Sequence, residues 1–183
     1  NHDASTILRF LDRGVQGIIV PHINTRSQAE GVTKAARYHP EGDRGVGGGR
    51  AHDYGINTTR SESTKFVNDN ILVIPMIEEV EAIKNVSEIA SVEGVDVLHV
   101  APGDLSQSMS NPPQSEVRET MDKVVPKIRG AGKWVGVGGN SPNDVERVSD
   151  LINLGANMIT IAAQGLMKSG AESFRKSVEN HLT

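Results

Sequence analysis

The sequence predicts an α/β protein in which parallel strands alternate with helices. Four times along the chain, an apolar helical face leads into a glycine, and the glycine leads into a short apolar run. A glycine at that place is typical of the left-handed residue that ends a helix. The apolar runs are nearly continuous, which indicates strands buried on both faces, as in a parallel sheet covered by helices. The expected strands are 15–21, 71–77, 95–102, 134–138 and 157–162, and the four glycines are Gly14, Gly94, Gly132 and Gly155.

Strand–helix units of this kind build either an open doubly wound sheet or a closed (β/α)8 TIM barrel, and the pattern alone does not separate the two. No linker-like change of composition divides the chain, so residues 1–183 are expected to form one domain. A closed barrel takes about 250 residues, so in that interpretation roughly three strands and about 65 to 75 residues precede Asn1. A first residue other than methionine agrees with this interpretation.

The elements between the strands carry their own signals. The first strand follows an apolar helical face at 7–11, and the glycine-rich and then polar segment 42–70 is expected to lie over the barrel mouth. Glu78 and Glu79 mark a helix start after the second strand. A helix is expected to open at 115–116 and to be kinked or interrupted by Pro126. The order Ser141-Pro142 predicts an N-cap and a first helical residue for the next helix.

Composition excludes several function classes. The formal net charge is -4, and the chain has one Trp, two Tyr and three Phe, which argues against a nucleic-acid partner. No apolar run approaches the roughly 20 residues of a membrane span, so no membrane partner is expected. Cysteine is absent, which excludes disulfides, thiolate metal sites and a thiol nucleophile. These features favour a cytoplasmic protein.

Two acidic side chains stand where parallel α/β proteins build their sites. Glu78 and Asp104 each follow the carboxyl end of an expected strand, and both are expected on an exposed edge. Two converging carboxylates, without cysteine or paired histidines, suit a hard divalent cation such as Mg²⁺ or Mn²⁺. The alternative is that Glu78 begins its helix and Asp104 caps the next one. Near Asp104, the turn Ala101-Pro102-Gly103 exposes backbone N–H groups that can hold a substrate carboxylate.

These strings resemble the HpcH/HpaI family, the class II, metal-dependent pyruvate aldolases of the phosphoenolpyruvate/pyruvate barrel superfamily. The similar segments are 17–21, 36–40 with 42–47, 81–85, 92–96 and 101–106, in family order along essentially the whole chain. The resemblance implies the TIM barrel, here lacking roughly its first three strands. It also implies that Glu78 and Asp104 are metal ligands and that Ala101, Pro102 and Gly103 bind the substrate carboxylate.

The catalytic residues of the family have no counterpart in this chain. The family's base is a histidine held by an aspartate, and its enolate-stabilising arginine ends the third strand. By the resemblance, both lie upstream of Asn1. Several positions depart from the family pattern, namely Met76, Ala101, Gly103 and Ser110, which argues for a divergent branch and against naming an aldehyde.

The resemblance implies a lyase that cleaves or forms a 4-hydroxy-2-oxo acid through a pyruvate enolate, with an oxo acid as its small-molecule substrate. The alternatives are an oxo-acid (oxaloacetate) decarboxylase using the same site and a non-catalytic barrel-fold binding protein. The resemblance further implies a homo-oligomer, a trimer or a hexamer, and the closing helix at 166–181 carries an apolar stripe that suits either subunit contact or internal packing. His22 is interpreted as a hydrogen-bonded histidine at the rim, with a position lining the site as the alternative, and His99 as a satisfied core residue.

Overall fold

The computed structural model describes residues 2–182, so Asn1 lies outside the described residues, and the expectation of further strands before Asn1 stays a prediction. The chain forms one five-stranded sheet in which every pair of neighbours is parallel. The strands are β1 Gly17–Val20, β2 Leu72–Ile77, β3 Val97–Val100, β4 Trp134–Asn140 and β5 Met158–Ile161. All five expected strands are present; β4 extends two residues beyond its expected end, and the other four have tighter bounds than expected.

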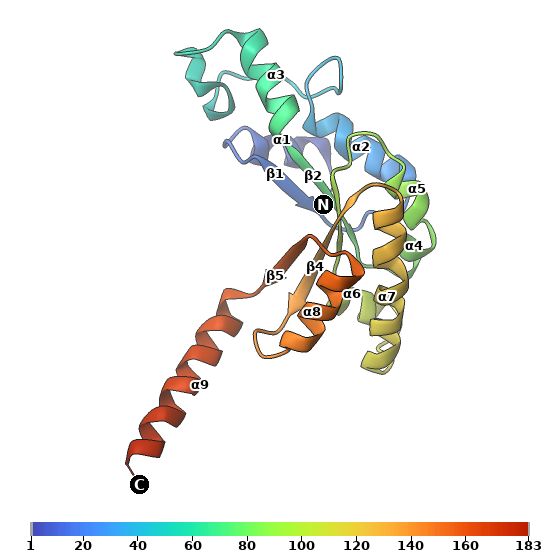
Figure 1. Cartoon of the computed structure of the whole chain (residues 1–183). Helices are drawn as coiled ribbons and strands as arrows, with labels where there is room; N and C mark the ends of the chain where they lie inside the picture. The colour runs from blue at the N-terminus through green and yellow to red at the C-terminus, as the bar shows by residue number, and fades with distance from the viewer. Residues whose placement is uncertain (1, 183) are drawn as a thin grey trace.

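The strand order decides between the two expected architectures. The order in the sheet is β1-β2-β3-β4-β5, so each strand pairs with the next one along the chain. An open doubly wound sheet reverses its order at a switch point, whereas a barrel adds each strand beside its predecessor. The five curved strands in Figure 1 therefore form part of a TIM barrel. The predicted barrel is confirmed.

A row of helices covers the outer face of the sheet (Figure 1). Successive helices contact one another along this row, and their apolar faces pack with outward strand residues such as Leu98 and Val100 into one core. The helices are α1 Ala4–Leu11, α2 Arg26–Ala36, α4 Val80–Lys84, α5 Val86–Ala90, α6 Pro102–Ser108, α7 Gln114–Gly130 and α8 Val145–Leu154. The central strand β3 is buried along its whole length. The strands β1 and β5 are more exposed, because they lie at the edges of the described sheet.

Four glycines take the conformation that the sequence pattern requires. Gly14, Gly94, Gly132 and Gly155 have φ values of 87°, 84°, 79° and 115°. Side chains at such angles crowd the backbone, which is why glycine is favoured there. Each glycine lies between a helix and the next strand, so the repeated helix–glycine–strand pattern predicted from the sequence is confirmed.

Two helix expectations are corrected by the structure. Helix α7 is not interrupted at Pro126, because this proline is on the exposed face and the carbonyl it leaves unpaired, that of Asp122, can bond to water. Helix α8 does not begin at Pro142. Asp144 is its N-cap and accepts a hydrogen bond from the N–H of Arg147 at 3.3 Å, while Ser141 belongs to the turn before it.

The predicted position of segment 42–70 was also wrong. This segment forms the 3-10 helix η1 Arg50–Gly55 and helix α3 Arg60–Asn70, and α3 leads directly into β2. Its residues line a cavity together with Gln16 and Ile71, which stand immediately before β1 and β2. The segment therefore lies at the amino ends of the strands, opposite the mouth. A helix that feeds a strand must end at that strand's amino end.

Candidate functional site

The carboxyl ends of the first three strands meet around one small hollow. Its volume is about 260 Å³, and it is lined by His22, Glu78, Glu79, Asp104, Gln107 and Ser108. His22 follows β1, the two glutamates follow β2, and the other three residues belong to α6, which follows β3. The structure thus brings the two predicted carboxylates, Glu78 and Asp104, to the same place.

Glu78 is held inside the fold. Only 3% of the residue is exposed, so the expectation of an exposed edge is wrong for Glu78. Its Oε1 accepts a hydrogen bond from the backbone N–H of His22 at 2.8 Å, and the ring nitrogen Nδ1 of His22 lies 3.4 Å from the same oxygen. No described residue donates to its Oε2. Since Glu78 lines the hollow, Oε2 is the oxygen left to face a ligand.

Glu79 connects the loop after β1 to the end of β2. Its Oε1 accepts a hydrogen bond from Nδ1 of His22 at 2.7 Å, and its Oε2 accepts one from Nδ2 of Asn24 at 2.6 Å. The hydrogen bonds from His22 and then from Asn24 lower the pKa of Glu79. His22 is confirmed as a hydrogen-bonded rim residue. From its place in the sequence, Glu79 was expected only to mark a helix start, although it stands beside Glu78.

Asp104 is exposed and lies in the first turn of α6. It is not the N-cap of that helix, because Ala101 occupies the N-cap position and Pro102 follows it. An acidic side chain in a first helical turn is stabilised by the helix dipole, so its position also has a structural benefit. Asp104 also lines the hollow together with Glu78, so its position has a chemical benefit as well.

The turn before Asp104 offers fewer donors than its sequence suggests. The N–H of Ala101 donates to the carbonyl of Ile77 at 3.3 Å within the sheet, and Pro102 has no N–H. The N–H groups of Gly103 and Asp104 have no protein acceptor among the described residues. Backbone binding of a carboxylate at this turn therefore depends on Gly103 and Asp104.

The donor set at the hollow fits a hard divalent cation. Carboxylate oxygens are the ligands that Mg²⁺ and Mn²⁺ prefer, and Mg²⁺ keeps several positions for water or substrate. Within residues 2–182, no group of three or more acidic or histidine side chains is placed to enclose a metal ion. Two carboxylates beside an open hollow suit a cation that shares its coordination sphere with a chelating substrate.

His99 is buried but not satisfied, which corrects its interpretation as a satisfied core residue. It is 5% exposed, and its Nδ1 has no hydrogen-bond partner among the described residues. Burial lowers the pKa of its imidazole. The ring lies against Gly136 and Gly138 of β4, where an added Cβ would come within 2.5 and 2.7 Å of its nitrogens. The strand glycines are therefore a packing feature around His99.

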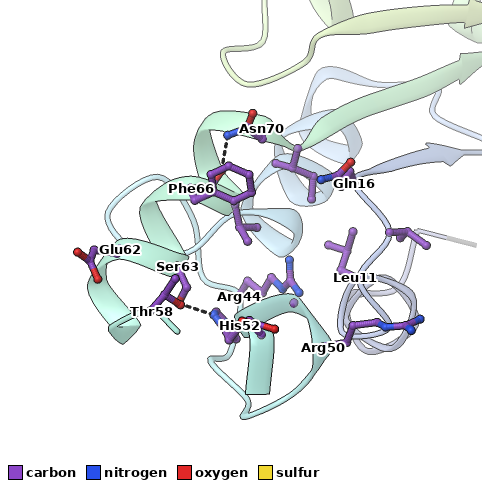
Figure 2. Close-up of a pocket in the computed structure, with 16 residues that line it drawn as sticks. Leu11, Gln16, Arg44, Arg50, His52, Thr58, Glu62, Ser63, Phe66 and Asn70 are labelled. Atoms are coloured by element: carbon purple, nitrogen blue, oxygen red, sulfur yellow. Dashed lines mark hydrogen bonds between the residues drawn. The ribbon is translucent and has the colours of Figure 1, made fainter. Parts of the chain in front are cut away.

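A larger cavity lies elsewhere, at the amino ends of β1 and β2. Its volume is about 640 Å³, and Figure 2 shows Arg44 lying between His52 and Leu11 there, with Phe66 nearby. His52 is buried and bonded on both sides, to the hydroxyl of Tyr38 at 2.9 Å and to that of Ser63 at 2.8 Å. Arg44 pairs with Asp12 at 2.9 Å and stacks on Tyr38. These bonds hold segment 42–70 to the body, and none of the predicted site residues lines this cavity.

The fold and the hollow define the class of the protein: a TIM-barrel protein with an acidic site at the carboxyl ends of its strands. More particularly, the chain belongs to the HpcH/HpaI aldolase/citrate lyase family, whose family model matches residues 1–168. The family that the sequence strings resemble is thereby confirmed.

Known relatives agree with this assignment. The chain is 36% identical over 138 residues to a hydroxypyruvate/pyruvate aldolase of Pseudomonas aeruginosa, covering 74% of this chain and 51% of the relative. It is 31% identical over 170 residues to a 2-keto-3-deoxy-L-rhamnonate aldolase of Shigella boydii, covering 91% of this chain and 62% of the relative. The chain thus spans between half and two thirds of these relatives' lengths, and it is a homologue of pyruvate-dependent aldolases.

A solved structure confirms the fold. An HpcH/HpaI aldolase/citrate lyase family protein from Burkholderia cenocepacia J2315 superposes with a TM-score of 0.85 at 25% sequence identity, covering 100% of this chain and 71% of that one. The five parallel strands correspond to part of that barrel. Among the described residues, no helix is long and apolar enough to cross a membrane.

Proposed function

We propose that the protein is a divalent-metal-dependent aldolase, a lyase that cleaves or forms a 4-hydroxy-2-oxo acid through a pyruvate enolate. The observation that carries the proposal is the meeting of Glu78 and Asp104 at one hollow at the carboxyl ends of β2 and β3. Sequence similarity to a hydroxypyruvate/pyruvate aldolase and to a 2-keto-3-deoxy-L-rhamnonate aldolase also supports the proposal.

Each part of the site has a task in this proposal. Glu78 and Asp104 hold Mg²⁺ or Mn²⁺ through carboxylate oxygens. The cation, when bound, supplies Lewis-acid stabilisation to the oxo acid and its enolate. The free N–H groups of Gly103 and Asp104 orient the substrate carboxylate beside it. No residue of this chain is assigned as the catalytic base or as the enolate-stabilising arginine, which are implied by the resemblance alone.

The test compares two reactions that pass through the same enolate. Pyruvate release is measured from 4-hydroxy-2-oxo acids and from oxaloacetate, each with Mn²⁺ and with a chelator. The proposal predicts metal-dependent retro-aldol cleavage that exceeds decarboxylation. Faster release from oxaloacetate would favour the decarboxylase, and no release from any oxo acid would favour a binding protein.

A second assay separates the metal mechanism from one that uses a lysine Schiff base. None of the described lysines lies at the carboxyl end of a strand, and Lys133 donates to the carbonyls of Val92 and Val95 before β4. Treatment with pyruvate and borohydride should therefore leave the mass of the protein unchanged. A reduced lysine adduct would contradict the proposal.

A further inference from the structure

The loop after β1 contains a strained residue next to the metal site. His22 has a φ of 59°, in the left-handed region that side chains other than glycine rarely occupy. The same residue donates its backbone N–H to Oε1 of Glu78 at 2.8 Å. The conformation of His22 therefore determines where this donor points, and with it how the buried carboxylate of Glu78 is oriented.

Glu79 holds that conformation from the neighbouring strand. One of its carboxylate oxygens binds Nδ1 of His22 at 2.7 Å, and the other binds Nδ2 of Asn24 at 2.6 Å. Because an ionised carboxylate only accepts hydrogen bonds, Nδ1 of His22 carries the hydrogen. Asn24 is fixed in turn, since its carbonyl accepts from Nδ2 of Asn85 at 2.8 Å. Both ends of the strained turn are thus tied to the segment that follows β2.

We propose that Glu79 is a positioning residue for the metal ligand Glu78: through His22 and Asn24 it fixes the turn whose N–H holds Oε1, which leaves Oε2 free for the cation. This inference rests on the proposed function, because it assumes that Glu78 binds a metal. Outer contacts that orient metal ligands are known to change metal affinity by about 10- to 100-fold. Glu79 acts through the turn and does not itself bind the metal.

The test uses the affinity for Mn²⁺, measured by the loss of the free-ion signal in electron paramagnetic resonance. Glu79→Ala removes both contacts and should weaken Mn²⁺ binding by about 10-fold or more. His22→Val should weaken it similarly, because a β-branched residue resists the left-handed conformation. His22→Gly should stay near wild type, since glycine adopts that conformation freely and keeps its N–H. Glu81→Ala removes one exposed charge nearby, from a side chain that makes no hydrogen bond or ion pair with the described residues, and serves as the control.

The double variant Glu79→Ala with His22→Gly distinguishes positioning from direct ligation. If Glu79 acts through the turn, glycine should restore part of the lost affinity. Absence of any recovery, or wild-type affinity in Glu79→Ala, would overturn the inference. Glu78→Gln is measured in parallel: if it binds Mn²⁺ as wild type does, the metal site itself is wrong and the inference fails with it. Thermal unfolding without metal should be unchanged in Glu79→Ala within a few degrees, which separates positioning from a loss of fold.

Discussion

Individual side chains in this protein differ in how firmly the fold holds them. Glu78 is buried and bonded, whereas Asp104 is exposed and tied only to the start of a helix. The two proposed ligands therefore combine one fixed carboxylate with one that can adjust. Such a pair suits a cation whose coordination changes when a substrate binds and water leaves.

The buried His52 should make stability depend on pH. Burial, followed by the charge of Arg44, lowers the pKa of His52 in the folded protein below its ordinary value of 6.5. Below about pH 6.5 the unfolded chain binds a proton that the folded chain does not, so stability falls as the pH decreases. For a single titrating group, this slope cannot exceed about 1.4 kcal/mol per pH unit.

Denaturant unfolding between pH 7.5 and 5.5 measures this slope. His52→Gln should give a shallower dependence, because the variant cannot take up the proton. His99, whose pKa is also lowered by burial, retains its own contribution in both proteins. An identical slope in wild type and variant would show that His52 is not the group responsible.

Single elements were predictable to different degrees. The strands and the left-handed glycines follow from local patterns, because helix ends and buried strands leave marks within a few residues. The position of segment 42–70 could not be predicted from local patterns, because it depends on the distant contacts of Arg44 with Asp12 and of His52 with Ser63. In the site, Glu78 and Asp104 could be named from their places after strands. The burial of Glu78 and the role of Glu79 depend on His22, 56 and 57 residues away.

Strand β4 should tolerate no side chain at Gly138. A Cβ there would lie 2.7 Å from Nε2 of His99 and 3.3 Å from Oγ1 of Thr160. We expect Gly138→Ala to lower the free energy of unfolding by about 1–3 kcal/mol, as overpacking does. In the His99→Ala background the same change should cost less, so a double-mutant cycle should give a clear coupling energy.

Gly170→Ala is the matched control for this experiment. A Cβ at Gly170, inside helix α9 Ala163–His181, would meet no atom within 4 Å. Alanine at this place should be neutral or stabilising, because glycine is the poorer helix residue. Equal costs for Gly138→Ala with and without His99 would contradict the packing described for β4.

At the scale of the whole molecule, helix α9 contacts the rest of the described chain near its start, where Ser169 donates to Asn143 at 2.9 Å, while its later turns are exposed. Figure 1 shows α9 extending away from the sheet, and none of its described residues is buried. The apolar stripe of the sequence is therefore exposed, with Phe174 at 72%. Internal packing against the chain's own sheet is not observed in the described residues. The stripe supports the proposal that the protein is a homo-oligomer, a trimer or a hexamer, in which α9 packs against another subunit.

Light scattering at micromolar concentration tests this assembly. The wild-type protein should have the mass of a trimer or hexamer. Phe174→Asp should reduce that mass by placing a charge in the contact, while Lys176→Asp changes an exposed residue on the opposite face of α9 and should leave the mass unchanged. A monomeric wild-type protein that retains activity would refute the proposal.

The central claim is that Glu78 and Asp104 together hold a divalent cation, and calorimetric titration with Mn²⁺ tests it most directly. Glu78→Gln and Asp104→Asn keep the shape of each side chain and remove its charge. We expect one binding site in the wild-type protein and a loss of affinity greater than about 100-fold in each variant, beyond the effect of an outer contact. Unchanged Mn²⁺ affinity in either variant would show that this residue does not hold the cation.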